Sequence, residues 1–470
     1  MPRLPALAAL LAAAGLSACT LAPAYERPAM PVGSAWPDAA PAAGPSAADL
    51  DWRQVIEDRR LQALVDLALR QNRDLRVAVA NIARARAEYR IQRADLLPAL
   101  DAVGSATRSR TPGDLSATGR TLDARQYSVG VGASYELDLF GRIRSLSDAA
   151  LQSFFAVEEN RRAAQISLIA EVASNYVTLA ADQELLKVAH DTLASREAAS
   201  TLIRRRFEAG ASSQLDLSQA ETLTEQARSD AAAAVARVAQ DRNALQLVVG
   251  APLPADLLPD GGEVAIRADL QPGLPSDVLL RRPDVLAAEH TLQARNADIG
   301  AARAAFFPRI SLTGQAGTAS PALSGLFGAG SGAWTFAPQI TLPLFSGGAN
   351  LANLAAAKAD RTIATAQYEK AIQTAFREVA DALAVRATIQ ERIAAQERLQ
   401  VAAADAQRLT QARYDRGVDA YLNLLDAQRT LYGARQALIG VRLAESLNRI
   451  DLYRALGGGG GEPAPAAPAR

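Results

Sequence analysis

One stretch of the chain, residues 127–140, separates apolar side chains from small or acidic ones at every second position. Its sequence is YSVGVGASYELDLF. Because side chains of a β-strand alternate between two faces, one face is apolar and the other carries serine, glycine, Glu136 and Asp138. The length suits the roughly 9–11 tilted residues that cross a bilayer in a barrel. We therefore predict a membrane strand with Val131 and Leu137 toward lipid and the two acidic residues toward the lumen or its mouth.

The same alternation returns in the second half of the chain. RISLTGQAG, from Arg309, alternates apolar and polar residues, and so does the segment 334–344. Pro338 and Pro343 interrupt the latter, and Pro343 falls near its exit, where a lost ladder hydrogen bond matters least. We predict a pair of strands in each half, and we expect an arginine to be tolerated better at Gly130 than on the lipid face.

The chain also repeats itself outside the strands. RFEAGASSQLDLSQAE aligns with RYDRGVDAYLNLLDAQ, and Gly210 falls on Gly417, an offset of 207 residues. An offset that holds across a turn and its two flanking helices indicates an internal duplication. We predict two structural repeats, 53–262 and 263–458, each with a helical hairpin that turns at its glycine.

Long helices are predicted between the strand pairs. Residues 142–208 contain no proline, and apolar residues recur there at steps of three and four. The other predicted helices are 349–416, 214–248, 421–456, 74–96 and 284–306. A simple coiled-coil rod would show the same stripes, but it would leave the strands unexplained.

Four strands cannot span a bilayer alone. Every edge N–H and C=O that faces hydrocarbon would lack a partner, and the smallest known membrane barrels have about eight strands. Closure therefore needs other copies of the chain. Two copies would give eight strands and three would give twelve, and the periodicity does not decide between them.

The N-terminus has the pattern of a secreted lipoprotein. Residues 1–18 carry one positive charge and an apolar run too short to span a membrane, which predicts a signal peptide. The tetrad that ends at Cys19, the single cysteine, resembles the bacterial lipobox and predicts acylation there. We expect residues 19–52 to run extended along the surface and residues 459–470 to form a disordered tail.

Composition gives no support to an enzyme or a nucleic-acid binder. Fifty basic and fifty acidic residues cancel. The only histidines, His190 and His290, stand on helical segments without a ligand or nucleophile motif, and we expect them to be structural. No phosphate loop or metal-ligand spacing is present, so we predict no cofactor and no metal.

Jointly, several motifs resemble one family over nearly the whole chain past the signal. CTLAPAYERP after the lipobox, YELDLFGR, RRPDVLAAEHTLQARNADIGAARAAFFPRISL, PLFSGG and RYDRGVDAYLNLLDAQRTLY look like the TolC-like outer-membrane efflux channels, in their lipid-anchored OprM-like and NodT-like branch. The resemblance implies a membrane α+β fold with two internal repeats, in which four strands per chain complete a twelve-stranded barrel in a homotrimer. A long periplasmic helical barrel continues it.

The resemblance also implies partners and a gate. A periplasmic adaptor and an inner-membrane pump of the resistance-nodulation-division type would supply the energy, while this channel conducts passively. Leu422 and Asp426 lie on one helical face near the turn, where the family has constricting rings. Asn423 and its repeat mate Asp216 are weaker gate candidates. Alternatively, Asp426 merely pairs with Arg429 on a solvated face.

Two other functions stay open from the residues alone. A channel for type I protein secretion would use the same fold with a different inner-membrane partner. A periplasmic adaptor or structural coiled-coil lipoprotein would be helical and anchored, but it would lack membrane strands. The sequence does not identify the transported substrate.

Overall fold

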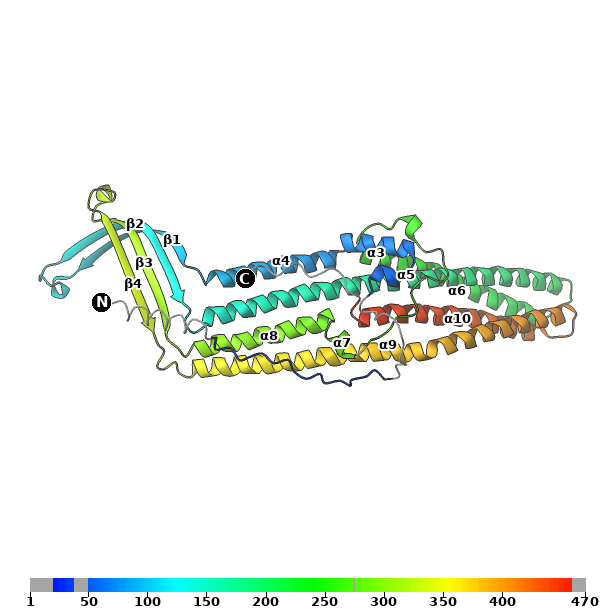
Figure 1. Cartoon of the computed structure of the whole chain (residues 1–470). Helices are drawn as coiled ribbons and strands as arrows, with labels where there is room; N and C mark the ends of the chain where they lie inside the picture. Colours follow the sequence, from blue (N-terminus) through cyan, green and yellow to red (C-terminus); the bar gives the residue numbers. More distant parts are fainter. Residues whose placement is uncertain (1–19, 38–49, 274, 459–470) are drawn as a thin grey trace. The chain divides into compact units, whose positions relative to one another are not determined.

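The computed structural model describes residues 20–37, 50–273 and 275–458. The helices and strands of this part are α2 (Trp52–Val55), α3 (Arg59–Gln71), α4 (Arg73–Ala94), β1 (Ala99–Thr111), β2 (Leu122–Leu137), α5 (Arg142–Glu208), α6 (Gln214–Val249), α7 (Pro275–Leu279), α8 (Pro283–Ala304), β3 (Arg309–Ser320), β4 (Gly332–Thr341), α9 (Ala349–Asp415) and α10 (Tyr421–Ala455) (Figure 1). Short 3-10 turns stand at Gly113–Leu115, Ala255–Leu257 and Leu323–Gly325.

The chain divides into two compact units. The first contains the strands and comprises Met1–Ala29, Asn81–Glu158 and Ala287–Tyr368. The second is helical and comprises Met30–Ala80, Glu159–Leu286 and Glu369–Arg470. Each unit is therefore built from pieces of both sequence halves.

The helices agree with the sequence to within two residues at each end. Helices α5 and α9 both have 67 residues, and neither contains a proline. Each ends just before a turn glycine in the left-handed region, Gly210 at φ 74° and Gly417 at φ 72°. Glycine reaches this conformation without a Cβ clash, so it stops the helix where the sequence predicts.

The four strands form one antiparallel sheet in the order β1-β2-β3-β4 (Figure 1). Strand β2 begins at Leu122, earlier than predicted, and ends at Leu137 rather than at residue 140. The prediction of a strand through 140 is wrong because the carboxylate of Asp138 accepts the backbone N–H of Arg144 at 2.9 Å, which caps the first turn of α5. The first strand of this pair, β1, has a weaker alternation, and only its place in the repeat indicates it.

Strand β4 also ends earlier than predicted. It stops at Thr341, so Leu342 and Leu344 lie outside it, ahead of α9. Pro343, which has no N–H, cannot continue the ladder. Pro338 remains inside β4 opposite Leu312, where an edge strand tolerates a proline.

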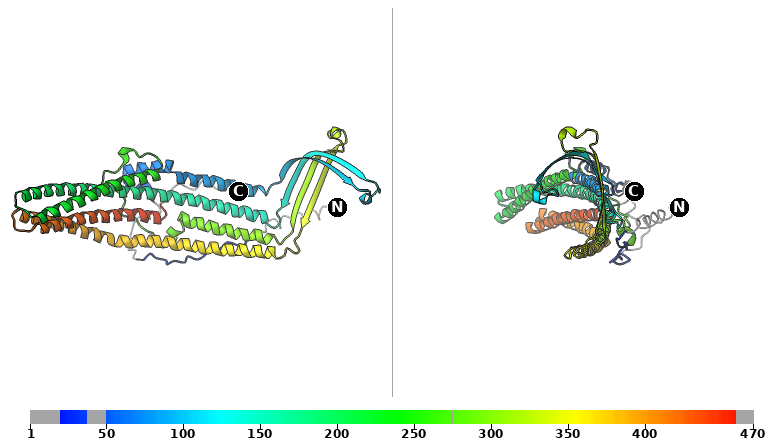
Figure 2. Two further views of the ribbon diagram at one scale, coloured as in Figure 1. Left: turned by 180° about the vertical axis from the view of Figure 1, so that it is seen from behind. Right: turned by 90° about the vertical axis from the view of Figure 1, so that its left-hand side faces the viewer.

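In the second unit, part of the core lies between two helices of the first half. Helix α3 buries Leu61, Leu64, Val65 and Ala68 completely and packs against α6. The turn between α5 and α6 and the turn between α9 and α10 lie at the same end of this unit in both views (Figures 1 and 2). We call this end the helical tip.

Residues 20–37 form no helix or strand. In the first unit, Asn296 of α8 donates to the carbonyl of Pro23 at 2.7 Å, and Arg303 of α8 donates to that of Leu21 at 2.9 Å. Residues 20–29 therefore lie on α8 as an extended strap. Cys19, the predicted signal 1–18 and the predicted tail 459–470 lie outside the described residues.

Candidate functional site

The cross-strand register gives the whole sheet two chemically different faces. Val131 lies opposite Ala316, which in turn lies opposite Trp334. The apolar face, built from β2, β3 and β4, carries Val129, Val131, Tyr135, Leu137, Ile310, Leu312, Trp334, Phe336 and Ile340. The polar face carries Ser128, Ser134, Glu136, Ser311, Thr313, Gln315, Thr335 and Gln339.

Several large side chains of the apolar face are exposed in the single chain. Trp334 is 78% exposed, Phe336 62% and Val131 54%. Contiguous exposed apolar surface marks contact with a membrane or another protein. The sheet therefore has a face that needs a nonaqueous neighbour and a face that suits water.

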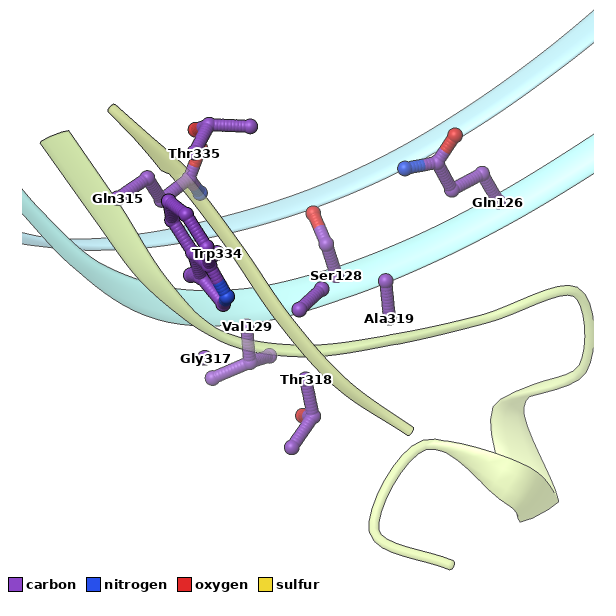
Figure 3. Close-up of a pocket in the computed structure, with 10 residues that line it drawn as sticks. Gln126, Ser128, Val129, Gln315, Gly317, Thr318, Ala319, Trp334 and Thr335 are labelled. Atoms are coloured by element: carbon purple, nitrogen blue, oxygen red, sulfur yellow. The ribbon is translucent and has the colours of Figure 1, made fainter. Parts of the chain in front are cut away.

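A groove of about 130 Å³ opens where β2, β3 and β4 curve (Figure 3). Its lining combines carboxamides and hydroxyls, including Gln126, Gln315 and Thr335, with glycine and alanine. The small residues leave the hollow, and Val129 and Trp334 add apolar surface to its polar lining.

Glycines bring β2 and β3 unusually close together. A Cβ added at Gly130 would stand 2.6 Å from the carbonyl oxygen of Ala316. The expectation that arginine is mild at Gly130 is therefore wrong, because any side chain there meets backbone. Thr335, exposed on the polar face, is a better position for that comparison.

Glu136 and Asp138, the predicted lumen residues, both stand where β2 gives way to α5. Glu136 lies on the polar face, and its carboxylate accepts paired bonds of 2.9 Å from Arg142 and one of 2.6 Å from Arg309. Asp138 pairs with Arg144 at 3.3 Å. Both carboxylates therefore fix the strand-to-helix junction, in addition to any role toward a lumen.

At the helical tip, both hairpins share one apolar cluster. Ile203 and Leu217 of the first hairpin pack with Tyr421, Leu424 and Leu425 of the second. The two turns are therefore held together by core packing rather than by the turn residues.

The predicted gate residues are neighbours in sequence of the residues in this cluster. Leu422 is 50% exposed, beside the buried Tyr421. Asn423 is exposed as well. Asp426 forms an ion pair with Arg429 in which both side chains are largely exposed. Such a pair contributes little stability, so it leaves the Asp426 charge accessible.

Asp216, the other predicted gate residue, is engaged in a helix cap. It accepts the backbone N–H of Ser213 at 3.1 Å, while its own N–H donates to the Ser213 hydroxyl at 3.1 Å. Hydrogen bonds from Ser213 hold the pKa of Asp216 below its usual value. The carboxylate therefore stabilises the start of α6.

Sequence reasoning missed the polar contacts that hold the strap. The Glu289 carboxylate is almost fully buried and accepts Arg27 at 2.8 and 3.0 Å and the Tyr25 hydroxyl at 3.1 Å. The only sequence signal is that the aligned position in the first repeat is Val79. His290, next along α8, makes a 2.8 Å hydrogen bond with Gln152.

The described residues contain neither a metal-binding cluster nor an apolar membrane helix. In that part of the chain, no cluster of three or more histidine, cysteine or acidic side chains could hold a metal ion. No helix within the described ranges is both long and apolar enough to cross a membrane.

A two-faced sheet joined to paired long helices defines the class of outer-membrane channel subunits, and comparison with known proteins gives the family. The model of the outer membrane efflux protein family matches residues 64–251 and 274–458, one match in each half. The chain belongs to this family, which is a family of channels and not of enzymes.

The protein is similar to several characterised members. It is 49% identical to outer membrane protein OprJ of Pseudomonas aeruginosa over 96% of this chain and 95% of the relative. It is 48% identical to the toluene efflux pump outer membrane protein TtgC of Pseudomonas putida over 94% of this chain and 93% of the relative. The crystal structure of the open Neisseria gonorrhoeae MtrE outer membrane channel matches with a TM-score of 0.84 at 43% identity, covering 94% of this chain and 98% of that one. The protein is thus an outer-membrane channel of an efflux system.

Proposed function

We propose that three copies of this chain close a twelve-stranded barrel in the bacterial outer membrane and passively conduct small apolar or amphiphilic compounds. The two-faced sheet is the observation that carries the proposal. Its free edges, on β1 and β4, have no partner strand in the described part of the chain, and only closure satisfies such edges in lipid. The apolar face, with Val131 and Leu137, then meets lipid, and the polar face lines the lumen.

The names of the relatives support the proposed cargo and partners. One is named for toluene efflux and another for antibiotic efflux, both in Pseudomonas putida. A passive channel needs an energised inner-membrane pump, here of the resistance-nodulation-division type, and a periplasmic adaptor to reach it. The helical unit is the part that would meet the adaptor.

Complementation tests this function. In a strain that has the pump and adaptor but lacks its own outer-membrane channel, the protein should restore survival in toluene and growth with antibiotics. Restoration should be lost when the pump is also deleted. Full restoration without the pump would contradict passive conduction.

A gate at the helical tip is the second part of the proposal. Three copies would set Leu422 and Asp426 around one axis as an apolar ring beside a cation-attracting ring. Asn423 and Asp216 stand nearby, and Asp216 is the weaker candidate because it caps α6. The turns at Gly210 and Gly417 would form the end of the tip.

Single-channel recording tests the gate. Leu422→Ala with Asp426→Ala should raise conductance and reduce cation preference without changing trimer yield. The matched control is Leu215→Ala with Gln219→Ala, the aligned positions of the first hairpin, which should leave both quantities unchanged. Parental conductance and selectivity in the double variant would contradict the gate.

The third part is the lipid anchor at Cys19. The lipobox tetrad supports cleavage after residue 18 and acylation of the cysteine thiol. Because a closed barrel already holds the protein in the membrane, Cys19→Ser should lose its acyl groups and still leave some inserted trimer. An unmodified mature N-terminus of the parent protein, seen by mass spectrometry, would contradict the anchor.

A further inference from the structure

A polar groove of about 170 Å³ lies in the helical unit between α5, α9 and α10. It is separate from the sheet and from the predicted gate residues. It is lined by Asp191, Thr192, Ser195, Arg196, Gln407, Gln428, Leu431, Tyr432 and Arg435.

Arg196 is the unusual member of this set. Its residue is only 6% exposed, and its guanidinium donates one hydrogen bond, to the carboxamide oxygen of Gln428. Among the described residues, no carboxylate forms an ion pair with it. Burying a charge is unfavourable unless it is paired and hydrogen-bonded, so a guanidinium in this position calls for an explanation.

The rest of the Arg196 guanidinium opens into the groove. A guanidinium has five N–H donors in a planar fork, and Gln428 takes only one of them. None of the nitrogens of Arg196 is among the fully buried side-chain atoms without a partner. The remaining donors are therefore accessible from outside the protein, and both Arg196 and Gln428 line the groove.

The electrostatics of the groove favour an anion. Arg435, half-buried, adds a second positive charge to the lining, and the exposed Asp191 is its only negative one. Desolvation by burial holds the pKa of Arg196 below its usual value, and the charge of Arg429 acts in the same direction. A bound anion would offset both effects.

We propose that this groove binds a single carboxylate or phosphate group of a small solute, with the Arg196 guanidinium as its bidentate partner and Arg435 beside it. The planar fork of arginine matches the two oxygens of such a group. The volume admits a small anion but not a folded partner. This site is additional to the conducting function and does not depend on it.

Titration of the purified full-length protein in detergent tests the proposal, with succinate and inorganic phosphate as separate probes. Calorimetry should show binding of at least one probe to the parent, and the melting temperature should rise with its concentration. Arg196→Gln should weaken that binding about tenfold or more, since it removes a charge-assisted bidentate contact. Arg435→Gln should weaken it less and provides a second test if Arg196→Gln does not fold.

Two further variants separate a binding site from a structural arginine. Arg398→Gln removes an exposed charge from α9 outside the groove and should leave binding unchanged. Arg196→Met should raise the melting temperature without probe and abolish its rise with probe, because an apolar chain replaces an uncompensated buried charge. If Arg196 had only a structural role, Arg196→Met would instead lower the melting temperature without probe.

Three results would overturn the proposal. The first is no response of the parent to either probe. The second is equal weakening by Arg398→Gln, which would indicate only bulk charge. The third is trimer loss in Arg196→Gln with unchanged anion response, which would assign the guanidinium to a carboxylate of a neighbouring copy.

Discussion

The two helical hairpins begin with helices of the same length, α5 and α9, and turn at glycines with nearly the same backbone angle, but different side chains complete those turns. Helices α5 and α9 have 67 residues each, and the turn glycines have φ 74° and 72°. In the first hairpin, Ser213 and Asp216 form a reciprocal capping box at the start of α6. In the second, the residue at the Ser213 position is Ala420, which has no side-chain cap.

The second turn is held in another way. Arg413 donates two hydrogen bonds to Asp419, at 2.7 and 3.0 Å, across the Gly417 turn. Hydrogen bonds from Arg413 hold the pKa of Asp419 below its usual value. The duplication has thus kept the position that only glycine fits easily and has let the surrounding polar contacts diverge. The two turns therefore have the same backbone conformation but are stabilised by different polar contacts.

The largest expected effect is on the sheet, where the two sequence halves should respond alike to an arginine on the apolar face. Val131→Arg in the first half and Trp334→Arg in the second should both reduce heat-resistant oligomer in outer-membrane fractions. An arginine on the lipid face near the bilayer midplane costs about 2–4 kcal/mol. Both residues lie on one cross-strand line of the apolar face.

The control for this pair is Thr335→Arg, next to Trp334 but on the polar face. It should be mild. If it reduces the oligomer as strongly as Trp334→Arg, the assignment of the two faces is wrong.

The hydrogen bonds that hold the strap go to α8 of the second half, so loss of its ion pair should have no counterpart in the first half. Arg27→Ala leaves the buried Glu289 carboxylate of α8 with Tyr25 as its remaining partner among the contacts described. Loss of hydrogen bonds to a buried charge costs about 1.5–3 kcal/mol. We expect a lower melting temperature and faster hydrogen exchange in residues 20–29.

Arg76→Ala, an exposed arginine of α4, is the matched change in the first half and should alter neither quantity. Unchanged exchange of the strap in Arg27→Ala would mean that the backbone contacts to α8 are sufficient.

Substitution of either turn glycine should lower stability by a similar amount. Gly210→Ala and Gly417→Ala should each cost about 1–2 kcal/mol, because a Cβ in the left-handed region is strained even though nothing else lies near it. Thermal unfolding of the two variants should match within error. Asn at either position should cost less, since it visits this region more readily, and an equal loss for Asn and Ala would point to a cause other than backbone conformation.

Removing the side-chain cap of α6 and adding one to α10 should reverse the difference in stability between the two helix starts. Ser213→Ala should destabilise the start of α6 by about 1 kcal/mol, and Ala420→Ser should stabilise the start of α10 by up to that amount. Amide exchange at residues 214–217 and 421–424 measures both. Faster exchange at α10 in Ala420→Ser would indicate that the backbone before α10 does not admit a side-chain cap.

The smallest expected effect is the pH dependence that Asp241 adds to the first half. Desolvation, together with a hydrogen bond and repulsion from Asp182, raises the pKa of Asp241 on α6 to about 6. The aligned residues of the second half are Ile389 and Asn448, which do not titrate. A carboxyl whose pKa is raised in the folded state favours folding when protonated, so its contribution grows as pH falls from about 6 to 4 and is lost above that range.

Asp241→Asn, which installs the second-half residue, should flatten this dependence. After solvent screening, the difference should be below about 1 kcal/mol. It is measured as melting temperature against pH, and an identical profile for parent and variant would contradict the raised pKa.

Several features of the fold could be predicted from sequence because they depend on local geometry. The alternation from Tyr127 and the proline-free run of α5 set strand and helix by their periods of two and about 3.6. The glycine at each turn follows from the left-handed backbone that ends the preceding helix. These properties need no knowledge of distant residues.

Strand ends are less accessible to sequence reasoning. The end of β2 depends on the Asp138 carboxylate reaching Arg144, and the Gly130 constraint depends on how closely β3 approaches. Alternation alone gives no such information. Pro343 marks an interruption in the sequence, but it does not by itself place the strand end at Thr341.

The sequence by itself determined the duplication, the two-faced strands and the helical frame, because periodicity and hydrophobic burial act over a few residues. Only the tertiary structure decided which polar groups meet: Glu289 with Arg27 across more than half the chain, and Arg196 with Gln428 and with no carboxylate among the described residues. Such contacts depend on the packing of segments far apart in sequence, and the physical reason is that a buried charge takes whatever partner the fold brings within hydrogen-bond distance.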